Sequence, residues 1–418
     1  MQQFSKSPFK SANENRARAA VFGSFRVFTI GDIGELESHA AAWNDLAFET
    51  AQPMLSYAWI LSFFEHQLES GQDWVCLLVY RDVHLVGVLP LVCTVQKILG
   101  REHLSLWTPF NWHTPCVDFL VKPGFEDEVI PLILETLNDF NPHYSSLKIR
   151  RLQESAPMLK MARNCLPDMP ILQRFNGKGS YIEVAGSFEE YRATLKASFV
   201  RNLNRLERKL KKLGDLHYEF ITENTDNPNY LQTFLEIEAS CWKGRNNSAI
   251  SKCPSHREFY MTLTRRLARL GWLEWHFLAA AGKTIAANLA IRVNHRLVIL
   301  KIGYDEKYAS YSPGSKLFEK MIKRAFDSGE IDEIDCLSEY TWNRNWRMKT
   351  RSFYDLTIYP DLPMILLCRY LPAKLYRFFC QLPLLNYPCR LCHQIIRRFR
   401  PKQDPKNKNY CLNKKIKG

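Results

Sequence analysis

Residues 295–317 read HRLVILKIGYDEKYASYSPGSKL and join a strand-like run to a helix-like run. The apolar residues of 295–304 are typical of a strand, and KLFEKMIKRAF at 316–326 has the spacing of an amphipathic helix. Between the two runs, Pro313 suits a first helical position and Gly314 has no Cβ to keep a ligand from the backbone. The loop is therefore expected to be a phosphate cradle at a helix start, or only a helix capped by Ser312.

The strand pattern around this stretch occurs twice in the chain. LLVYRDVHLVGVLPL aligns with LAAAGKTIAANLAI at an offset of 200, which places Leu85 over Ile285 and Leu89 over Leu289. Short turns between the strands require antiparallel pairing, and a strand–helix–strand step after them requires a crossover. We therefore expect an α/β fold with two copies of one domain, each a mixed, mostly antiparallel sheet flanked by helices.

The expected organisation follows from the composition and from helix signals. The expected segments are a disordered start (1–22), a degenerate first domain (23–152), a linker (153–186), an active second domain (187–360) and a basic amphipathic tail (361–418). The helix signals of the second domain are a Ser187/Glu190 capping box with one long helix to Gly214, Asn227-Pro228 at a second start, and a Ser255/Glu258 box with an end at Gly271.

The positive charge of the chain is concentrated in two places. The net charge is +14, while residues 361–418 hold thirteen Lys/Arg against two Asp/Glu and residues 188–213 hold eight against three. The start of the chain has no apolar signal region, and no run of about 18 apolar residues occurs. We expect a cytoplasmic protein whose twelve cysteines are mostly reduced and buried.

Residues 389–393 read CRLCH, the spacing of covalent haem attachment. That attachment takes place outside the cytoplasm, and a metal site at Cys389, Cys392 and His393 lacks an evident fourth ligand. No metal is expected.

Several segments together resemble the Gcn5-related N-acetyltransferase (GNAT) superfamily. They are SFVRNLNRLERKLKKLG (198–214), EIEASCWKG (236–244), AANLAIRV (286–293), IGYDEKYASYSPGSKL (302–317) and the strand ending IDCL (334–337). More narrowly, the second half is similar to the BioF2-like or CelD-like acetyltransferase family, which is akin to the FemAB-type aminoacyl transferases.

The resemblance implies metal-free transfer of an acyl group, expected to be acetyl, from acyl-CoA to an amine. The cofactor would lie on Lys301, Ile302, Gly303, Ser312, Gly314, Ser315 and Lys316. The candidates for proton transfer are Glu238, Asp305 and Glu339 as bases and Tyr304 as donor. The candidates for acceptor binding are Arg201, Trp242, Lys243 and Trp342.

The sequence departs from the family at one site and leaves rival functions open. Trp342 and Asn343 occupy the places of the family's Tyr-Lys pair, and the first copy has no loop like 311–317. The acceptor is expected to be an amino sugar of an envelope polysaccharide. One rival is FemAB-like transfer from aminoacyl-tRNA, and tRNA is the one nucleic acid expected as a partner. The basic helix has two interpretations: it is a solvated face, or it binds a polyanion such as tRNA. The other rival is a silent scaffold docked on a membrane.

The tail has two interpretations. It mixes apolar and basic residues, and prolines at 363, 372, 383 and 388 exclude one long helix. Short amphipathic pieces would contact an anionic membrane at its inner face, or the tail would pack on the domain.

Overall fold

The computed structural model describes residues 18–115, 118–140, 144–164, 170–246 and 248–381. Its strands form one 14-stranded sheet in the order β1-β2-β3-β4-β5-β7-β14-β8-β13-β12-β11-β10-β9, with β6 paired to β4. The elements of the first half are β1 (Arg18–Phe22), β2 (Phe25–Ile30), α2 (Ile33–Glu37), α3 (Ala40–Glu49), η1 (Pro53–Leu55), α4 (Tyr57–His66), β3 (Gln72–Arg81), β4 (His84–Ile98), β5 (Arg101–Trp107), β6 (Leu120–Val121), α5 (Glu126–Phe140), β7 (Tyr144–Gln153) and α6 (Pro157–Asn164).

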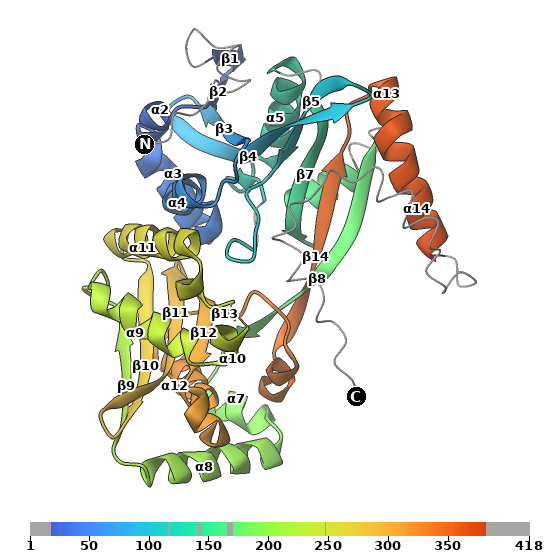
Figure 1. The fold of residues 1–418 in the computed structure, drawn as a ribbon. Coiled ribbons are helices and arrows are strands. Elements are labelled where there is room, and N and C mark those ends of the chain that lie inside the picture. Colours follow the sequence, from blue (N-terminus) through green and yellow to red (C-terminus); the bar gives the residue numbers. More distant parts are fainter. Residues whose placement is uncertain (1–17, 116–117, 141–143, 165–169, 247, 382–418) are drawn as a thin grey trace.

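The second half continues the same sheet (Figure 1). Its elements are β8 (Ile171–Glu183), α7 (Phe188–Thr194), α8 (Ala197–Lys211), β9 (Leu216–Ile221), α9 (Pro228–Ala239), α10 (Trp242–Arg245), η2 (Ile250–Lys252), α11 (Pro254–Arg269), β10 (Leu273–Ala280), β11 (Lys283–Val293), β12 (Arg296–Tyr304), η3 (Glu306–Tyr311), α12 (Pro313–Ser328), β13 (Glu333–Asp335), η4 (Thr341–Trp346), β14 (Lys349–Ile358), α13 (Pro363–Ile365), η5 (Leu366–Tyr370, a π-helical turn) and α14 (Leu371–Gln381).

The predicted repeat is confirmed. In the first half, β3, β4 and β5 pair antiparallel, and α5 leads to β7, which pairs parallel with β5. In the second half, β10, β11 and β12 pair antiparallel, and α12 leads to β13, which pairs parallel with β12. Both copies are therefore mixed, mostly antiparallel sheets flanked by helices, as the alternation and the short turns predict.

Two long strands join the halves. The stretch 153–186, expected to be a linker, contains α6 and β8. β14 lies between β7 of the first half and β8, and β8 also pairs with β13 of the second half. In Figure 1, β8 and β14 run from the upper lobe to the lower one. The sheet is therefore continuous across the halves.

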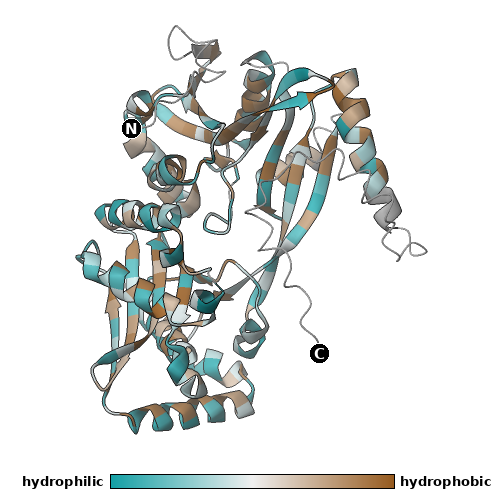
Figure 2. Cartoon of the chain, in the orientation of Figure 1, coloured by the Kyte–Doolittle hydropathy of each residue, from teal (hydrophilic) through white to brown (hydrophobic). Residues whose placement is uncertain are grey.

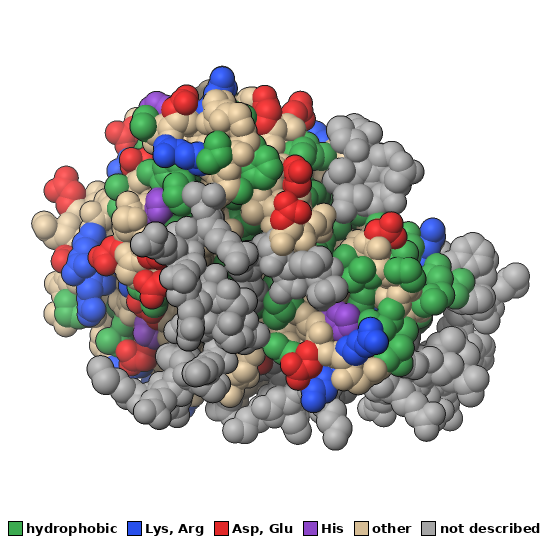
Figure 3. Space-filling model, turned by 90° about the horizontal axis from the view of Figure 1, so that it is seen from above, with side chains coloured by type: hydrophobic (Ala, Val, Ile, Leu, Met, Phe, Trp, Pro, Cys, Tyr) green, Lys and Arg blue, Asp and Glu red, His purple; other side chains and the backbone are tan. Residues whose placement is uncertain are grey.

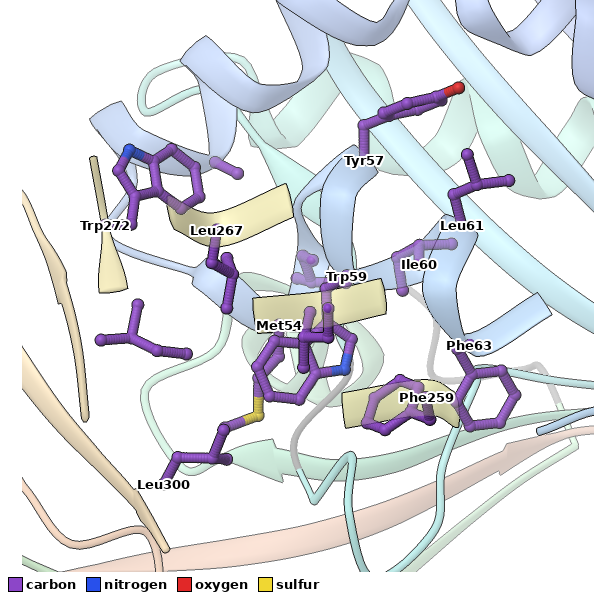
Figure 4. Packing of buried hydrophobic residues seen from close by; sticks show 14 of the residues in the cluster. Met54, Tyr57, Trp59, Ile60, Leu61, Phe63, Phe259, Leu267, Trp272 and Leu300 are labelled. Carbon is purple, nitrogen blue, oxygen red and sulfur yellow. The ribbon is translucent and has the colours of Figure 1, made fainter. Parts of the chain in front are cut away.

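A shared apolar core also holds the halves together. α4 packs on α11, where Trp59 lies at 6.1 Å from Phe259 between ring centroids. Figure 4 shows Trp59 from α4 among Phe259, Leu267, Met54 and Leu300. Colouring by hydropathy shows the apolar residues concentrated on the strands and on the inner faces of the helices (Figure 2). Burial of such rings is a large stabilising contribution, so the halves form one hydrophobic unit.

The structure corrects the predicted helix boundaries. The long helix from Ser187 breaks into α7 and α8, because Leu195 is extended (ψ 154°) and places its side chain in the core. The Ser187/Glu190 capping box is present. The predicted box at Ser255 is wrong, because Pro254 begins α11 after Cys253, which makes no side-chain cap bond. Asn227 caps α9 as predicted.

The two ends of the described chain also differ from expectation. Residues 18–22, expected to be disordered, form β1. The claim that prolines exclude a longer helix is wrong at Pro372, because α13, η5 and α14 follow without a break. Proline has no N–H to donate within a helix, and the π-helical turn just before it shifts the hydrogen-bond pattern so that the helix can continue. The prolines at 383 and 388 and the CRLCH stretch lie outside the described residues.

Candidate functional site

In the second half, part of β12 has a free edge where its pairing with β13 stops. β12 and β13 pair only through Arg296↔Glu333, Leu297↔Ile334 and Val298↔Asp335. β12 then continues to Tyr304 while β13 ends. In the part of the chain that the structure describes, residues 299–304 therefore have a strand partner on one side only, β11. Such an edge offers backbone N–H and C=O groups to an extended ligand.

This edge leads to the start of α12. Pro313 is the first helical residue, as predicted, but Ser312 is left-handed (φ 48°) and makes no side-chain cap bond. The Ser312 carbonyl accepts from the N–H groups of Ser315 (3.1 Å) and Lys316 (3.3 Å). Since proline has no N–H, the Gly314 N–H is the first in the helix, and among the described residues it has no backbone acceptor. A donor at a helix start favours an anion.

Gly314 itself is not required by packing. A Cβ built there would meet only Tyr304 Cδ1, at 3.7 Å, which is ordinary contact. An alanine therefore fits at this position, and a change of charge can be tested separately from a change of shape.

Lys316 lies inside the protein. Its side chain is 1% exposed, and its ammonium pairs with Glu207 of α8 at 3.0 Å and with Glu319 on its own helix. Glu319 also pairs with Arg192 of α7 at 3.2 Å. This network ties three helices together and leaves Lys316 with no exposed charge for a phosphate.

The residues that follow β12 are also engaged. Asp305 accepts from the Lys307 N–H at 3.1 Å and pairs with Lys283 at 3.1 Å. Burial raises the pKa of the Asp305 carboxyl, but these partners outweigh it and hold that pKa below its usual value. Burial, assisted by Glu306, raises the pKa of the Tyr304 hydroxyl. Tyr304 therefore keeps its proton and can donate it, while Asp305 acts as the cap of η3.

A polar cluster lies on the other side of β12, against α9. Glu238 is buried, accepts from the Ile250 N–H at 2.8 Å and pairs with Lys243 at 3.2 Å. Lys243 also donates to the Ile302 carbonyl at 3.0 Å. A Cβ at Gly303 would meet Glu238 Cα at 3.2 Å and its N at 3.3 Å. Gly303 therefore allows α9 to approach the strand closely enough for Glu238 and Lys243 to reach its edge.

The first half adds Trp112 and His113 to this cluster, and neither was predicted from the sequence. Lys301 donates to the Trp112 carbonyl at 3.3 Å. His113 lies 3.1 Å from the Tyr260 hydroxyl, and its ring centroid is 4.1 Å from that of His256. No spacing signal links residues so far apart in sequence, so only the packing of the halves brings them together.

Burial changes the charges in this cluster. It lowers the pKa of Lys301 to about 8, with the Lys243 charge as a second cause. It lowers the pKa of His113 to about 2, with Lys301 and His256 contributing. His113 is therefore neutral at pH 7, and Lys301 loses its proton close to physiological pH.

The remaining predicted residues lie elsewhere. Arg201 is exposed on α8, and Glu339 is exposed beside β8, where its N–H donates to the Lys178 carbonyl at 3.1 Å. Trp342 packs edge-on against Phe318 of α12, at 5.3 Å between centroids. Trp242 is 50% exposed at the start of α10, next to Lys243. Of the acceptor candidates, only Trp242 and Lys243 lie near the open edge of β12.

Comparison with known proteins agrees with this geometry. Residues 197–343 match the sequence family described as "Acetyltransferase (GNAT) domain". The matched part, which is less than half of the chain, is similar to GNAT domains and contains β12, the open edge and the start of α12. Among curated proteins, none matches the chain.

Three solved structures are similar to this chain over most of its length. The crystal structure of FemX has a TM-score of 0.53 at 10% identity, covering 78% of this chain and 96% of that one. A tandem GNAT protein from the clavulanic acid biosynthesis pathway has 0.40 at 11% identity, covering 79% and 98%. L-PGS from Bacillus licheniformis has 0.45 at 10% identity, covering 81% and 95%. The likeness to FemX is one of fold.

The described residues show no metal site and no membrane span. Within them, no three His, Cys, Asp or Glu side chains gather where they could hold a metal ion. No helix in these ranges has both the length and the apolar composition needed to cross a bilayer.

Proposed function

We propose that the protein is an N-acyltransferase that moves an acyl group from acyl-CoA to an amine. The observation that carries the proposal is the open edge of β12, which leads directly to the free Gly314 N–H at the start of α12. The edge suits the amide groups of an extended pantetheine arm, and the helix start suits the diphosphate. Lys301, Ile302 and Gly303 would contact the arm, and Ser312, Gly314 and Ser315 the diphosphate, without Lys316.

The reaction requires proton transfers at the nitrogen and at the leaving sulfur. The ammonium group must lose a proton before its nitrogen attacks the thioester carbonyl; a C–N bond then forms, the nitrogen loses a second proton, the C–S bond breaks and the thiolate takes a proton. Tyr304, whose pKa is raised by burial, would supply that last proton. Both Glu238 and Asp305 are hydrogen-bonded and ion-paired, but of the two it is Glu238 whose backbone packs against Gly303 at the edge of β12. We therefore assign Glu238 as the base and expect Glu238→Gln to lower kcat while acetyl-CoA binding is kept.

The test is a calorimetric titration of acetyl-CoA into the full chain and two variants. We expect the parent to bind, Gly314→Ala to bind within about threefold of the parent, and Gly314→Asp to bind at least tenfold more weakly because a carboxylate repels the diphosphate. Equal urea midpoints for the two variants would show that both are folded. Equal affinity of Gly314→Asp and the parent would remove the helix start from the site, and no binding by the parent would refute the acyl-CoA proposal.

The second candidate function is transfer from aminoacyl-tRNA. It is favoured by α8, whose basic residues Arg201, Arg205, Arg208, Lys209 and Lys211 are all exposed. On the face seen from above in Figure 3, by contrast, acidic and basic side chains are interspersed. If the parent fails to bind acetyl-CoA, filter binding with aminoacyl-tRNA distinguishes this candidate from a silent scaffold, because only the former predicts salt-dependent retention.

We also propose contact with an anionic membrane through the C-terminal helix. Leu367, Leu371 and Leu375 recur every four residues and are 64%, 41% and 55% exposed. Arg369 and Lys374 lie beside them in sequence. An exposed apolar stripe flanked by cations suits a lipid–water interface. A cytoplasmic location at the inner face of the membrane, and an amino-sugar acceptor, stay predictions from the sequence.

A further inference from the structure

A cavity of about 230 Å³ lies between the two halves, next to the open edge of β12. Its first-half walls come mainly from η1, Asp118 and the end of β7, and its second-half walls from β12, β14 and the end of β13 with the residues just after it. Val298 lines it and is also the last residue of β12 that pairs with β13. A ligand stretched along β12 from the start of α12 would therefore end at this cavity.

One wall carries an arginine in a strained position. Arg151 has φ 52°, in the left-handed region, and lies in a β-bulge where two β7 residues, Arg150 and Arg151, face Asp355 of β14. Asp355 stabilises the bulge, because it pairs with Arg150 at 2.9 Å and accepts from the Arg151 N–H at 3.1 Å. Bulges redirect side chains and recur beside active sites.

The guanidinium of Arg151 is held in place but not neutralised. It lies 4.5 Å from the ring centre of Phe353, and its Nη2 donates to the Leu337 carbonyl at 2.9 Å. Its Nε is buried without a hydrogen-bond partner in the described residues. No carboxylate there pairs with it, because Asp355 binds the Arg150 guanidinium. Arg151 therefore keeps a charge and a donor for another group.

Asp118, an acidic residue that lines the same cavity, also has no ion-pair partner in the described part of the chain. Asp118 accepts only from the adjacent Phe119 N–H, at 2.6 Å, and the described residues supply no ion-pair partner. Burial raises the pKa of its carboxyl to about 7. The two other charged residues that line the cavity, Arg296 and Asp335, pair with each other. Within the described ranges, one carboxyl group and one guanidinium of the cavity thus have no ionic partner.

We propose that this cavity binds a small zwitterion, with its ammonium group at Asp118 and its carboxylate at Arg151. Met54 and Leu55 supply apolar wall for the rest of the molecule. The volume is below the range usual for drug-sized ligands, which favours a compound the size of a free amino acid. Resting on the proposed function, we assign this zwitterion as the acyl acceptor, because the cavity begins where the thioester end of an extended cofactor would lie.

The test uses the twenty free L-amino acids as probes for the full chain, first by thermal shift and then by calorimetry. We expect at least one to bind. Its amide, which lacks the carboxylate, and its des-amino acid, which lacks the ammonium group, should each bind at least tenfold more weakly. If none of the twenty binds, or if the amide and the des-amino acid bind as well as the amino acid, the assignment is wrong.

Variants locate the site. Asp118→Asn and Arg151→Gln should each weaken amino-acid binding at least tenfold, whereas Asp139→Asn and Arg174→Gln, which neutralise exposed residues elsewhere, should not change it. Arg151→Lys keeps the charge and should bind between the parent and Arg151→Gln. Unchanged affinity in Asp118→Asn and Arg151→Gln would place the ligand elsewhere and overturn the assignment.

Acetyl-CoA titrations of the same variants separate this inference from the proposed function. Asp118→Asn and Arg151→Gln should bind acetyl-CoA like the parent. If the parent binds acetyl-CoA but no amino acid, only the cavity assignment fails. If it binds an amino acid but no acyl-CoA, the zwitterion site stands and the acyl-CoA proposal fails.

Discussion

Replacing Lys316 with methionine tests whether this residue stabilises the fold or binds phosphate. The substitution keeps most of the apolar stem but removes an ammonium that is 1% exposed and pairs with Glu207 and Glu319. Removing one partner from a buried ion pair costs about 3–5 kcal/mol. Here Glu319 keeps Arg192, and Glu207, which is 24% exposed, can turn toward water. We therefore expect a loss of about 2–3 kcal/mol in the free energy of unfolding.

The assay is urea unfolding at pH 7, with Lys320→Met as the matched control. Lys320 is 36% exposed and 3.9 Å from Glu207, so its removal should cost under about 1 kcal/mol. Acetyl-CoA affinity should change less than threefold in Lys316→Met.

The opposite pattern would show that Lys316 binds phosphate. A Lys316→Met protein as stable as Lys320→Met, with acetyl-CoA affinity reduced tenfold or more, would mean that the ammonium leaves Glu207 and Glu319 to bind the diphosphate. The role expected from the sequence would then be restored, and the α8–α12 ion pair would be a property of the free protein only.

Three further changes test other parts of the structure. Gly303→Val should destabilise the protein by about 1–3 kcal/mol and weaken acetyl-CoA binding, because its side chain meets Glu238 Cα at 3.2 Å; unchanged urea stability and affinity would contradict the close approach. The pKa of Asp118 is raised from 3.8 to about 7 on folding, so the native state holds its proton more tightly than the unfolded chain does. This group's contribution to stability should fall as pH rises from about 4 to about 7, by up to about 1.4 kcal/mol per pH unit, and Asp118→Asn should remove that slope in urea titrations; parallel curves would disprove it. Leu371→Asp with Leu375→Asp should abolish co-sedimentation with phosphatidylserine vesicles while leaving acetyl-CoA binding intact; vesicle binding equal to the parent's would show that α14 is not the contact.

Most of the fold could be predicted because its signals are local. Alternating apolar residues and two-residue turns determine the hairpins β3–β4 and β10–β11, and the capping box at Ser187 determines the start of α7. β14 could not be predicted in this way. Its sequence KTRSFYDLTI is largely polar, and it forms a strand because β7 and β8 pair with it from both sides. Likewise, the break at Leu195 depends on a core position that the sequence does not show.

The candidate site also contains residues that local sequence predicts and residues that only tertiary packing brings together. Gly303, Pro313 and Gly314 lie in one continuous stretch whose residue types reveal a close backbone approach and a helix start. Lys316 lies in the same stretch, but its direction depends on α8, which local sequence cannot show. The cluster at Lys301 and the cavity charges at Asp118 and Arg151 come from segments that only tertiary packing brings together.

The bulge at Arg151 links the joining strands to the proposed chemistry. Phe353, whose ring lies against the Arg151 guanidinium, pairs with Gln153 across β7 and β14. β8 is also bulged, because Asn176 and Gly177 together face Phe353 of β14 between the pairs Ser352↔Lys178 and Tyr354↔Phe175. The wall of the cavity is therefore set by hydrogen-bonded register within one sheet, and not by docking of two separate domains. A register slip of one residue reverses the face of every side chain in a strand. The pairing register of β7 with β14 therefore determines the face of the sheet on which Arg151 lies. If the proposed acceptor site is right, the first half contributes to it through β7, the strand that places Arg151 at the cavity wall.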